Sequence, residues 1–346
     1  MTIAQRAAAT NSSGVVVSKA GTSLVDWTDG GGHRPIETMS VTKMVVATIV
    51  GASLCADDRA VLDASVATWL PEWKDDERST INLRILLGHR SGLRSVAPPD
   101  IVGVADSYAA ALELPLEGHP TEAFVYNNLA FNVIGLIVQR ALGESIADVG
   151  ERLLFRPLGF REWDWVTDAA GNPRCHFGLI CRADDLAKIG HLYLDRGGVL
   201  PEWWTQRAIA SGMSCYPQLA WLRARISSAL VDQWKNAGID PELIDAVAAL
   251  VDREMDFDDL FAELKEVLGD EYHALPNAAL TRGLRWFEAT PGPPAGYGHD
   301  GDGGQQMIVY PELDGVAVRL RENLENGSMW SAFPGDAREV LERAVH

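Results

Sequence analysis

Basic residues are scarce in this chain of 346 residues, which has 30 lysines and arginines against 48 aspartates and glutamates and a net charge of −18. A chain this acidic repels phosphate backbones and anionic lipid surfaces, so neither nucleic acid nor a membrane is expected as a partner. The imbalance is concentrated between Asp232 and Glu271, where 13 acidic residues stand against 3 basic ones.

Cysteines and long apolar runs are also few. The four cysteines have no metal-like spacing and indicate free thiols in a reducing compartment: Cys55, Cys175, Cys181 and Cys215. Residues 45–54 are apolar, but they are only about half as long as a membrane span. Residues 1–14 lack the apolar core of a secretory signal. We therefore expect a cytoplasmic protein.

The hydrophobic residues, 47% of the chain, are enough for a buried core. Their pattern predicts short strands over 14–21 and 22–30 near one end, and over 305–312 and 315–322 near the other. Helices are predicted over 132–141, 183–194 and 335–346. Strands at both ends with helices between them predict an α+β fold, in which an antiparallel sheet is built from both termini and flanked by helices.

The same pattern divides the chain into parts. Residues 1–60 and 280–346 are predicted to form the sheet half, 61–216 the helical half, and 217–279 an acidic helical insertion. Apolar residues recur at helical spacing in two stretches of the insertion, 243–251 and 257–268. These stripes are expected to pack on each other and on the main body, although a lid over a cleft or a partner-binding surface would show the same pattern.

The stretch TMSVTKMVVATIVG, residues 38–51, places Ser40 three residues before Lys43 at the start of an apolar helix. On a helix these side chains share one face. One interpretation is that Ser40 caps the helix and Lys43 extends to solvent. The other is a nucleophile and its base, because a serine hydroxyl needs an adjacent base and burial lowers the pKa of a lysine. Ser-x-x-Lys alone does not decide between them.

Two further motifs carry polar groups suited to catalysis. Tyr126-Asn127-Asn128 is either a capped turn before a helix or a source of a tyrosine proton and of an amide that binds substrate. His299-Asp300-Gly301 is either a turn before a strand or a strand edge that glycine lets a substrate approach closely. The neighbouring acidic residues do not form a calcium loop, since its terminal glutamate is missing.

In this order the three motifs resemble those of the serine beta-lactamase and penicillin-binding protein superfamily. The similarity is greatest to its class C beta-lactamase-like branch, with the D-alanyl-D-alanine carboxypeptidases and the family VIII esterases. It extends over about residues 10–210 and 280–346. Other segments that carry it are WLPEW (69–73), INLRILLGHRSGL (81–93), FRPLGF (155–160), RADDLAKIGHLYLDRG (182–197) and GGQQMIVYPE (303–312). The resemblance implies a beta-lactamase/transpeptidase-like fold.

The resemblance also implies roles for the motif residues. Ser40 would be the acylated nucleophile, and Lys43 and Tyr126 would share its activation and the delivery of the proton. Asn128, His299 and Gly301 would contact the substrate, with His299 standing where the family usually has lysine. The backbone N–H groups of Ser40 and Asp302 would form the oxyanion hole.

The third motif departs from the family pattern, because Asp300 replaces the usual threonine or serine and Asp302 follows Gly301. Strand alternation would place both carboxylates on one face. In relatives that recognise beta-lactams this strand receives the substrate carboxylate, which two acids would repel. We therefore expect an uncharged ester or amide, or a cationic amine acceptor, rather than a penicillin or a peptide with a free carboxyl end.

The sequence thus predicts a serine acyl-transfer enzyme that acts through a covalent acyl-Ser40 intermediate on a small-molecule ester or amide. It would be an esterase, an amidase or an ester-to-amide transacylase, with water or an amine as acceptor and no cofactor or metal. The alternatives are a D-alanyl carboxypeptidase or beta-lactamase-type hydrolase, and a non-catalytic sensor or scaffold. A metal hydrolase using His33, His119 or His299 lacks paired ligand spacing. No oligomeric state is predicted.

Overall fold

The computed structural model describes residues 2–96, 101, 103–194, 198–211, 222–291, 296–323, 330 and 332–344. The chain divides into two compact units. The first contains Met1–Gln218, Gly296–Ser328 and Asp336–His346, and the second contains Leu219–Ala295 and Met329–Gly335. Of the predicted features, Cys215 and the start of the insertion, 217–221, lie outside the described residues.

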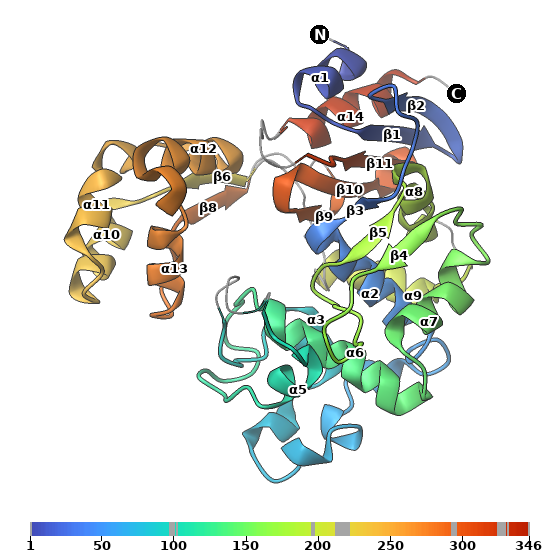
Figure 1. Ribbon diagram of the computed structural model, residues 1–346, viewed down its shortest axis with the longest axis horizontal. Helices are drawn as coiled ribbons and strands as arrows, with labels where there is room; N and C mark the ends of the chain where they lie inside the picture. The colour runs from blue at the N-terminus through green and yellow to red at the C-terminus, as the bar shows by residue number, and fades with distance from the viewer. Residues whose placement is uncertain are drawn as a thin grey trace. The chain divides into compact units, whose positions relative to one another are not determined.

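A five-stranded antiparallel sheet joins the two ends of the chain in the first unit (Figure 1). Its strand order is β2-β1-β11-β10-β9. The bounds are β1 Gly14–Lys19, β2 Thr22–Thr28, β9 Tyr297–Gly301, β10 Gln305–Tyr310 and β11 Gly315–Leu320. β1 pairs with β11 from Gly14 opposite Leu320 to Lys19 opposite Gly315. The sheet is therefore assembled from segments about 300 residues apart in sequence, as the alternating patterns predict.

Helices cover both faces of this sheet. Gly315 faces Leu341 of α14 (Phe333–Arg343), whereas the next residue, Val316, faces Gly190 of α8 (Ala183–Leu192). Successive side chains of a strand point to opposite faces, so α14 and α8 lie on opposite sides. α1 (Ile3–Ala9) joins the α14 side through an ion pair between Arg6 and Asp336. This double covering explains why β10 and β11 are buried along their whole length.

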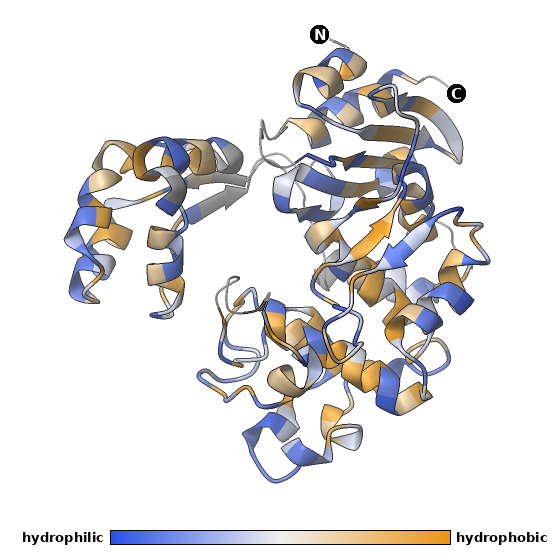
Figure 2. Ribbon diagram, viewed as in Figure 1, coloured by the Kyte–Doolittle hydropathy of each residue, from blue (hydrophilic) through white to orange (hydrophobic). Residues whose placement is uncertain are grey.

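The helical part of the first unit is built around α2 (Thr42–Ala52), whose residues are all buried. A helix that is apolar all round is a core helix. Around it lie α3 Leu83–Leu87, α5 Ser107–Leu112, α6 Asn128–Leu142, α7 Ile146–Gly150 and α9 Glu202–Ser211. Hydrophobic residues gather on these helices in Figure 2. Among the described helices, none alone is long and apolar enough to cross a membrane, and only the pair Asn128–Leu142 and Ile146–Phe155, bent by 76°, passes that test together.

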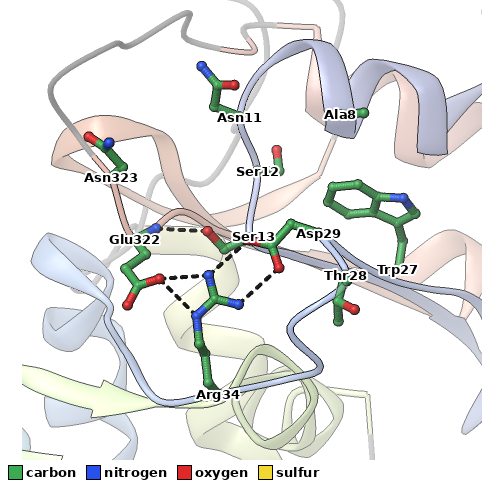
Figure 3. A pocket seen from close by; sticks show the side chains of 11 residues that line it. Ala8, Asn11, Ser12, Ser13, Trp27, Thr28, Asp29, Arg34, Glu322 and Asn323 are labelled. Carbon is green, nitrogen blue, oxygen red and sulfur yellow. Dashed lines mark hydrogen bonds and ion pairs between the residues drawn. The ribbon is translucent and has the colours of Figure 1, made fainter.

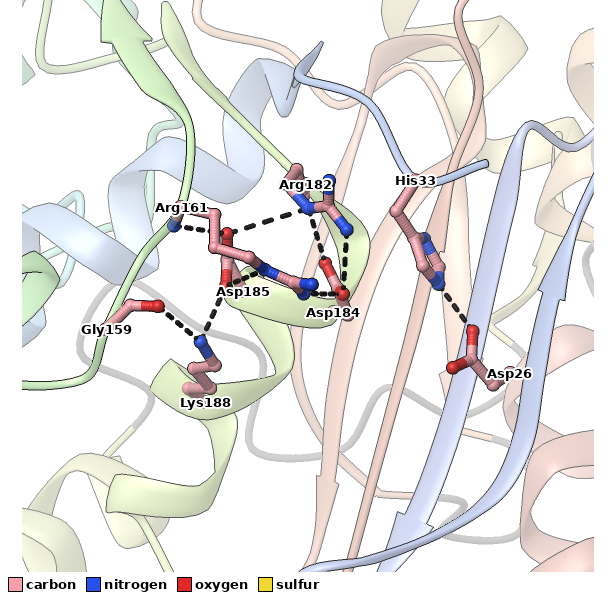
Figure 4. A network of polar contacts seen from close by, with 8 residues as sticks. All are labelled: Asp26, His33, Gly159, Arg161, Arg182, Asp184, Asp185 and Lys188. Carbon is pink, nitrogen blue, oxygen red and sulfur yellow. Dashed lines mark hydrogen bonds and ion pairs between the residues drawn. The ribbon is translucent and has the colours of Figure 1, made fainter. Parts of the chain in front are cut away.

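A small antiparallel sheet links the helical part to the segment that carries Ser40. Its order is β3-β5-β4, with β3 Ile36–Glu37, β4 Trp163–Trp165 and β5 Leu179–Cys181. Beyond β5, α8 is fixed by Asp185, whose fully buried carboxylate lies 2.6 Å from Lys188 Nζ and accepts the backbone N–H of Arg161 at 2.9 Å (Figure 4). Charges and hydrogen bonds around a buried carboxylate offset the cost of removing it from water.

The second unit has its own core, which includes Trp234, Ile244, Leu260 and Leu264. Its helices are α10 Ser228–Asn236, α11 Pro241–Ala246, α12 Phe257–Leu268 and α13 Ala274–Leu280. A three-stranded sheet in the order β7-β6-β8 accompanies them, with β6 Leu222–Arg225, β7 Met255–Asp256 and β8 Glu288–Pro291. The unit extends beyond the predicted boundary at 279 because β8 pairs with β6. The predicted apolar stripes pack on each other within this core.

Candidate active site

Ser40 lies in a tight turn that leads into α2. The turn, Met39–Val41, is a 3-10 helix, and Met39 before the serine has a φ of 48°, in the left-handed region where a side chain is strained. No side chain caps either this turn or α2. Thr42 holds the segment in place, because its hydroxyl accepts the N–H of Leu179 at 3.1 Å. The capping interpretation of Ser40 is therefore wrong, and its hydroxyl is left for other groups.

Lys43 is fully buried, so the interpretation in which it extends to solvent is also wrong. Its Nζ lies 3.1 Å from Ser40 Oγ and donates to the backbone carbonyl of His176 at 2.7 Å. Burial holds the pKa of Lys43 well below its ordinary value, and the charge of Asp300 opposes that shift. A neutral amine in this position keeps one N–H on the carbonyl and directs its lone pair at the serine hydroxyl.

Tyr126 contacts the same pair of residues. Lys43 Nζ lies 4.6 Å from the centre of the tyrosine ring, and the phenol hydrogen-bonds the Ser40 side chain. Burial raises the pKa of Tyr126 far above its ordinary value, and the hydrogen bond to Ser40 only partly offsets this. The phenol therefore keeps its proton near neutral pH. A phenol that keeps its proton can donate it, and a buried amine that is neutral can accept one.

The loop before α6 is fixed at Asn127, the residue between Tyr126 and Asn128. Its side-chain oxygen accepts the N–H of Ala130 at 3.0 Å and thereby caps α6, while its amide donates to the carbonyl oxygens of Leu93 and Arg94, each at 3.0 Å. The capped-turn interpretation is thus correct for Asn127 and compatible with a chemical role for its neighbours. Asn128 Oδ1 is buried and has no hydrogen-bond partner among the described residues.

The third motif lies at the end of β9, the edge strand. A side-chain carbon on Gly301 would lie 2.8 Å from the Thr38 carbonyl oxygen and 3.0 Å from the Ser40 nitrogen. Glycine is needed because the protein's own turn, Met39–Val41, rather than a substrate, approaches the strand here. The contact places Gly301, the residue before Asp302, beside the amide of Ser40. The oxyanion hole formed by the N–H groups of Ser40 and Asp302 stays a prediction.

His299, the first residue of that motif, is 2% exposed, and its ring centre lies 6.5 Å from that of Tyr126. Its Nδ1 lies within hydrogen-bond distance of the backbone carbonyl oxygen of Asp300. Because a carbonyl oxygen can only accept, Nδ1 carries the proton and donates it. Burial lowers the pKa of His299 to about 3, with a smaller contribution from Lys43. His299 is therefore neutral near pH 7, so it supplies no positive charge to bind a substrate carboxylate.

The prediction that Asp300 and Asp302 share a strand face is wrong. β9 ends at Gly301, and Asp302 begins a 3-10 turn, Asp302–Gly304. Strand alternation stops at that point. The Asp302 side chain is exposed, and its carboxylate accepts the N–H of Gly303 at 2.9 Å. Of the two acids, only Asp300 acts electrostatically on Lys43 and Tyr126.

Comparison with known proteins agrees with this arrangement. Residues 5–241, well over half of the chain, match the family described as Beta-lactamase. The chain belongs to the beta-lactamase family. Its α+β fold with a sheet built from both termini is the beta-lactamase-like fold that the sequence predicts, and the predicted family membership is confirmed.

Among the relatives in the beta-lactamase family, esterase EstB of Burkholderia gladioli is 31% identical over 149 residues, which are 37% of this chain and 38% of the esterase. The chain therefore matches less than half the length of that curated relative. A putative 6-aminohexanoate-dimer hydrolase from Bacillus anthracis has a TM-score of 0.63 at 16% identity, over 99% of this chain and 80% of that one. EstCE1, described as a hydrolase with promiscuous acyltransferase activity, has a TM-score of 0.56 at 15% identity, over 98% and 96%. At these identities the two structures show the fold alone.

Two groups that contact Tyr126 and Lys43 were not predicted from the sequence as site residues. His89 stacks on Tyr126 with ring centres 4.6 Å apart, and its Nδ1 accepts the N–H of Asn127 at 3.3 Å. It lies in the segment 81–93, which carried the family resemblance. The other is the backbone carbonyl of His176, which holds Lys43. A backbone acceptor is present in every residue type and leaves no sequence signal.

A pocket of about 660 Å³ lies beside β1 and β2, but its Arg34 is held by the carboxylates of Asp29 and Glu322, and none of the motif residues lines it (Figure 3). Among the described residues, no group of three or more histidine, cysteine, aspartate or glutamate side chains is placed to hold a metal ion. The three described cysteines, Cys55, Cys175 and Cys181, are buried free thiols.

Proposed function

We propose that the protein is a serine acyl-transfer enzyme that forms a covalent acyl-Ser40 intermediate with a small-molecule ester or amide. The observation that carries the proposal is the position of Ser40 Oγ between a buried amine, 3.1 Å away, and a protonated tyrosine. This is the arrangement of a nucleophile, a base and an acid expected for covalent catalysis. The esterase among its relatives and the family of the chain support it.

In the first half-reaction, Ser40 Oγ attacks the carbonyl carbon of the donor while its proton passes to Lys43 Nζ. The negative charge that develops on the carbonyl oxygen is stabilised by the N–H groups of Ser40 and Asp302. The bond from the carbonyl carbon to the leaving oxygen or nitrogen then breaks. The phenol of Tyr126 protonates the leaving group and recovers its proton from Lys43, so that both side chains are neutral again when the acyl-enzyme has formed.

In the second half-reaction, water or an amine attacks the acyl carbon, and its proton passes through Tyr126 and Lys43 back to Ser40 Oγ as the acyl–serine bond breaks. The first half-reaction is the same for hydrolysis and for transfer. An esterase, an amidase or an ester-to-amide transacylase is therefore consistent with one site. The acyltransferase activity named for EstCE1 is a precedent for transfer on this fold.

Intact-mass spectrometry tests the proposal directly. The protein is incubated with an uncharged fluorophosphonate and with a panel of activated esters and lactams, and the wild type is compared with Ser40→Ala. We expect one covalent adduct per chain in the wild type and none in Ser40→Ala. An adduct that persists in Ser40→Ala, or a wild type that no member of the panel modifies, would contradict the proposal. Adding an amine to the acyl-enzyme then separates transfer from hydrolysis by the product formed.

A further inference from the structure

Asp300 carries a carboxylate beside the candidate active site, and no lysine or arginine in the described part of the chain pairs with it. Its side chain is 40% exposed, and among the described residues the only basic group within 4.0 Å is the imidazole of His299. That imidazole is neutral near pH 7, because burial lowers its pKa to about 3. No lysine or arginine of the described part of the chain forms an ion pair with Asp300. A half-buried carboxylate without a positively charged partner is costly, and a bound cation would lower that cost.

A second acceptor lies next to it on the neighbouring strand. Gln306 of β10 stands directly opposite Asp300 of β9 in the sheet register. Residues paired across two antiparallel strands point to the same face, with side chains about 5 Å apart. Gln306 is 8% exposed, and its Oε1 has no hydrogen-bond partner among the described residues. Buried acceptors are nearly always satisfied, so this oxygen also lacks a donor.

The charge of Asp300 acts on the catalytic groups. It raises the pKa of Lys43, which burial lowers, and it contributes to the raised pKa of Tyr126. The carboxylate is therefore close enough to both for a direct electrostatic interaction. Its effect on Lys43 opposes the neutral form that the base must have. A positive charge bound at Asp300 would remove that opposition at the moment when substrate arrives.

We propose that the substrate carries a primary ammonium group, which binds to the carboxylate of Asp300 and the amide oxygen of Gln306 while the reacting carbonyl lies at Ser40. An ammonium has three N–H donors, enough to serve both acceptors and to balance the charge. The group belongs to the acyl donor or to the amine acceptor. This inference rests on the proposed function. In relatives that recognise beta-lactams this end of the strand binds a carboxylate, whereas here the end of β9 would select a cation.

The test compares molecules of nearly equal shape and different charge. Three 4-nitroanilides serve as donors: that of β-alanine, which ends in an ammonium, that of butyrate, which ends in a methyl group, and the monoanilide of succinate, which ends in a carboxylate. Two amines serve as acceptors for a preformed acyl-enzyme: the monocation of ethylenediamine and propylamine. Their rates of acyl transfer are compared at equal concentrations of unprotonated amino groups. The donors are also used to protect Ser40 from an uncharged fluorophosphonate, so that a compound that binds without turnover still gives a constant.

We expect the β-alanine anilide to be preferred over the butyrate anilide, or the ethylenediamine monocation over propylamine, by about tenfold in kcat/KM or in protection of Ser40. The succinate anilide should be the poorest donor. Asp300→Asn is expected to bring the ratio close to one, and Gln306→Leu to lower it without abolishing it. Asp57→Asn, an exposed change of the same kind in the loop after α2, should leave the ratio unchanged.

The outcomes separate the two proposals. Each ratio is measured within one variant whose Ser40 labelling shows that it is folded, so a loss of total activity does not affect it. Equal constants for the charged and uncharged members in both arms, with Ser40 labelled normally, would overturn the ammonium site and leave the acyl-transfer proposal standing. A Ser40 that the fluorophosphonate does not label would overturn the acyl-transfer proposal itself.

Discussion

Replacing Lys43 by methionine should lower kcat/KM by about 10²- to 10⁴-fold, the typical contribution of a general base. Methionine has a similar length and no charge, so it fills the buried space and removes only the amine. Without that amine, Ser40 has no neutral base within hydrogen-bond distance among the described residues, and the carbonyl of His176 loses its donor. Hydrolysis of an activated phenyl ester by the wild type and by Lys43→Met measures the effect.

The same change should raise the free energy of unfolding at neutral pH. Since burial depresses the pKa of Lys43 in the folded state, the unfolded chain binds one more proton below the ordinary lysine pKa of 10.5, and this favours unfolding. Methionine removes that cost. Lys188→Met is the matched control, because it breaks the contact with Asp185 at 2.6 Å and should lower stability while leaving kcat/KM unchanged. A Lys43→Met protein that is unstable but fully active would contradict the assignment.

Tyr126→Phe should lower kcat/KM by about 10²- to 10³-fold for an anilide or an alkyl ester, but by much less for a nitrophenyl ester. The reason is the leaving group: an amine or alkoxide must be protonated as it leaves, whereas a nitrophenolate does not need a proton. Burial keeps the Tyr126 phenol protonated, so its role is to donate. The ratio of the two substrates in wild type and variant measures the effect.

Tyr193→Phe is the matched control for that change. It removes a buried phenol that hydrogen-bonds Thr48 Oγ1 at 2.8 Å, and it should cost about 1 kcal/mol of stability with no change in the substrate ratio. An equal loss on both substrates in Tyr126→Phe would mean that the phenol only positions Ser40. No loss on either would remove Tyr126 from the mechanism.

Much of the site could be predicted because each motif is local. Ser40 and Lys43 are three residues apart on one helical turn, and the side-chain types report the chemistry. The strands 14–21 and 315–322 were predictable because each is a short apolar segment of strand type next to a turn, and pairing them required only that both ends of the chain form one sheet. Asn127 could be recognised as a helix cap from its own type.

The remaining features depend on contacts between distant segments. The carbonyl of His176 reaches Lys43 only after β5 has paired beside the nucleophile turn, and any residue could supply it. The face of Asp302 depends on where β9 ends, which the partner strand β10 decides and not the local sequence. Residues 288–291 lie within 280–346, the stretch predicted for the sheet half, but as β8 they pair with β6, more than 60 residues away in the sequence. Alternation and spacing do not report such contacts.

The central claim is that a buried, neutral Lys43 takes the proton of Ser40, and the pH dependence of Ser40 acylation tests it most directly. The second-order rate for an uncharged fluorophosphonate is measured by intact mass from about pH 5 to about pH 10. The groups that face Lys43 are Tyr126, His89, His176, His299 and Asp300. Burial lowers the pKa of His176 to about 2 and that of His299 to about 3, and it also lowers that of His89, so the histidines stay neutral throughout.

Burial raises the pKa of the Asp300 carboxyl, so the limb that belongs to Lys43 is the one that Lys43→Met removes. We expect the rate to fall tenfold per pH unit below an apparent pKa that lies well under the ordinary lysine value of 10.5, and to be constant above it. In Asp300→Asn the limb should move to lower pH, because the charge that raises the pKa of Lys43 is gone. A rate that continues to rise up to the ordinary lysine value, or a profile that is the same in Lys43→Met, would contradict the account.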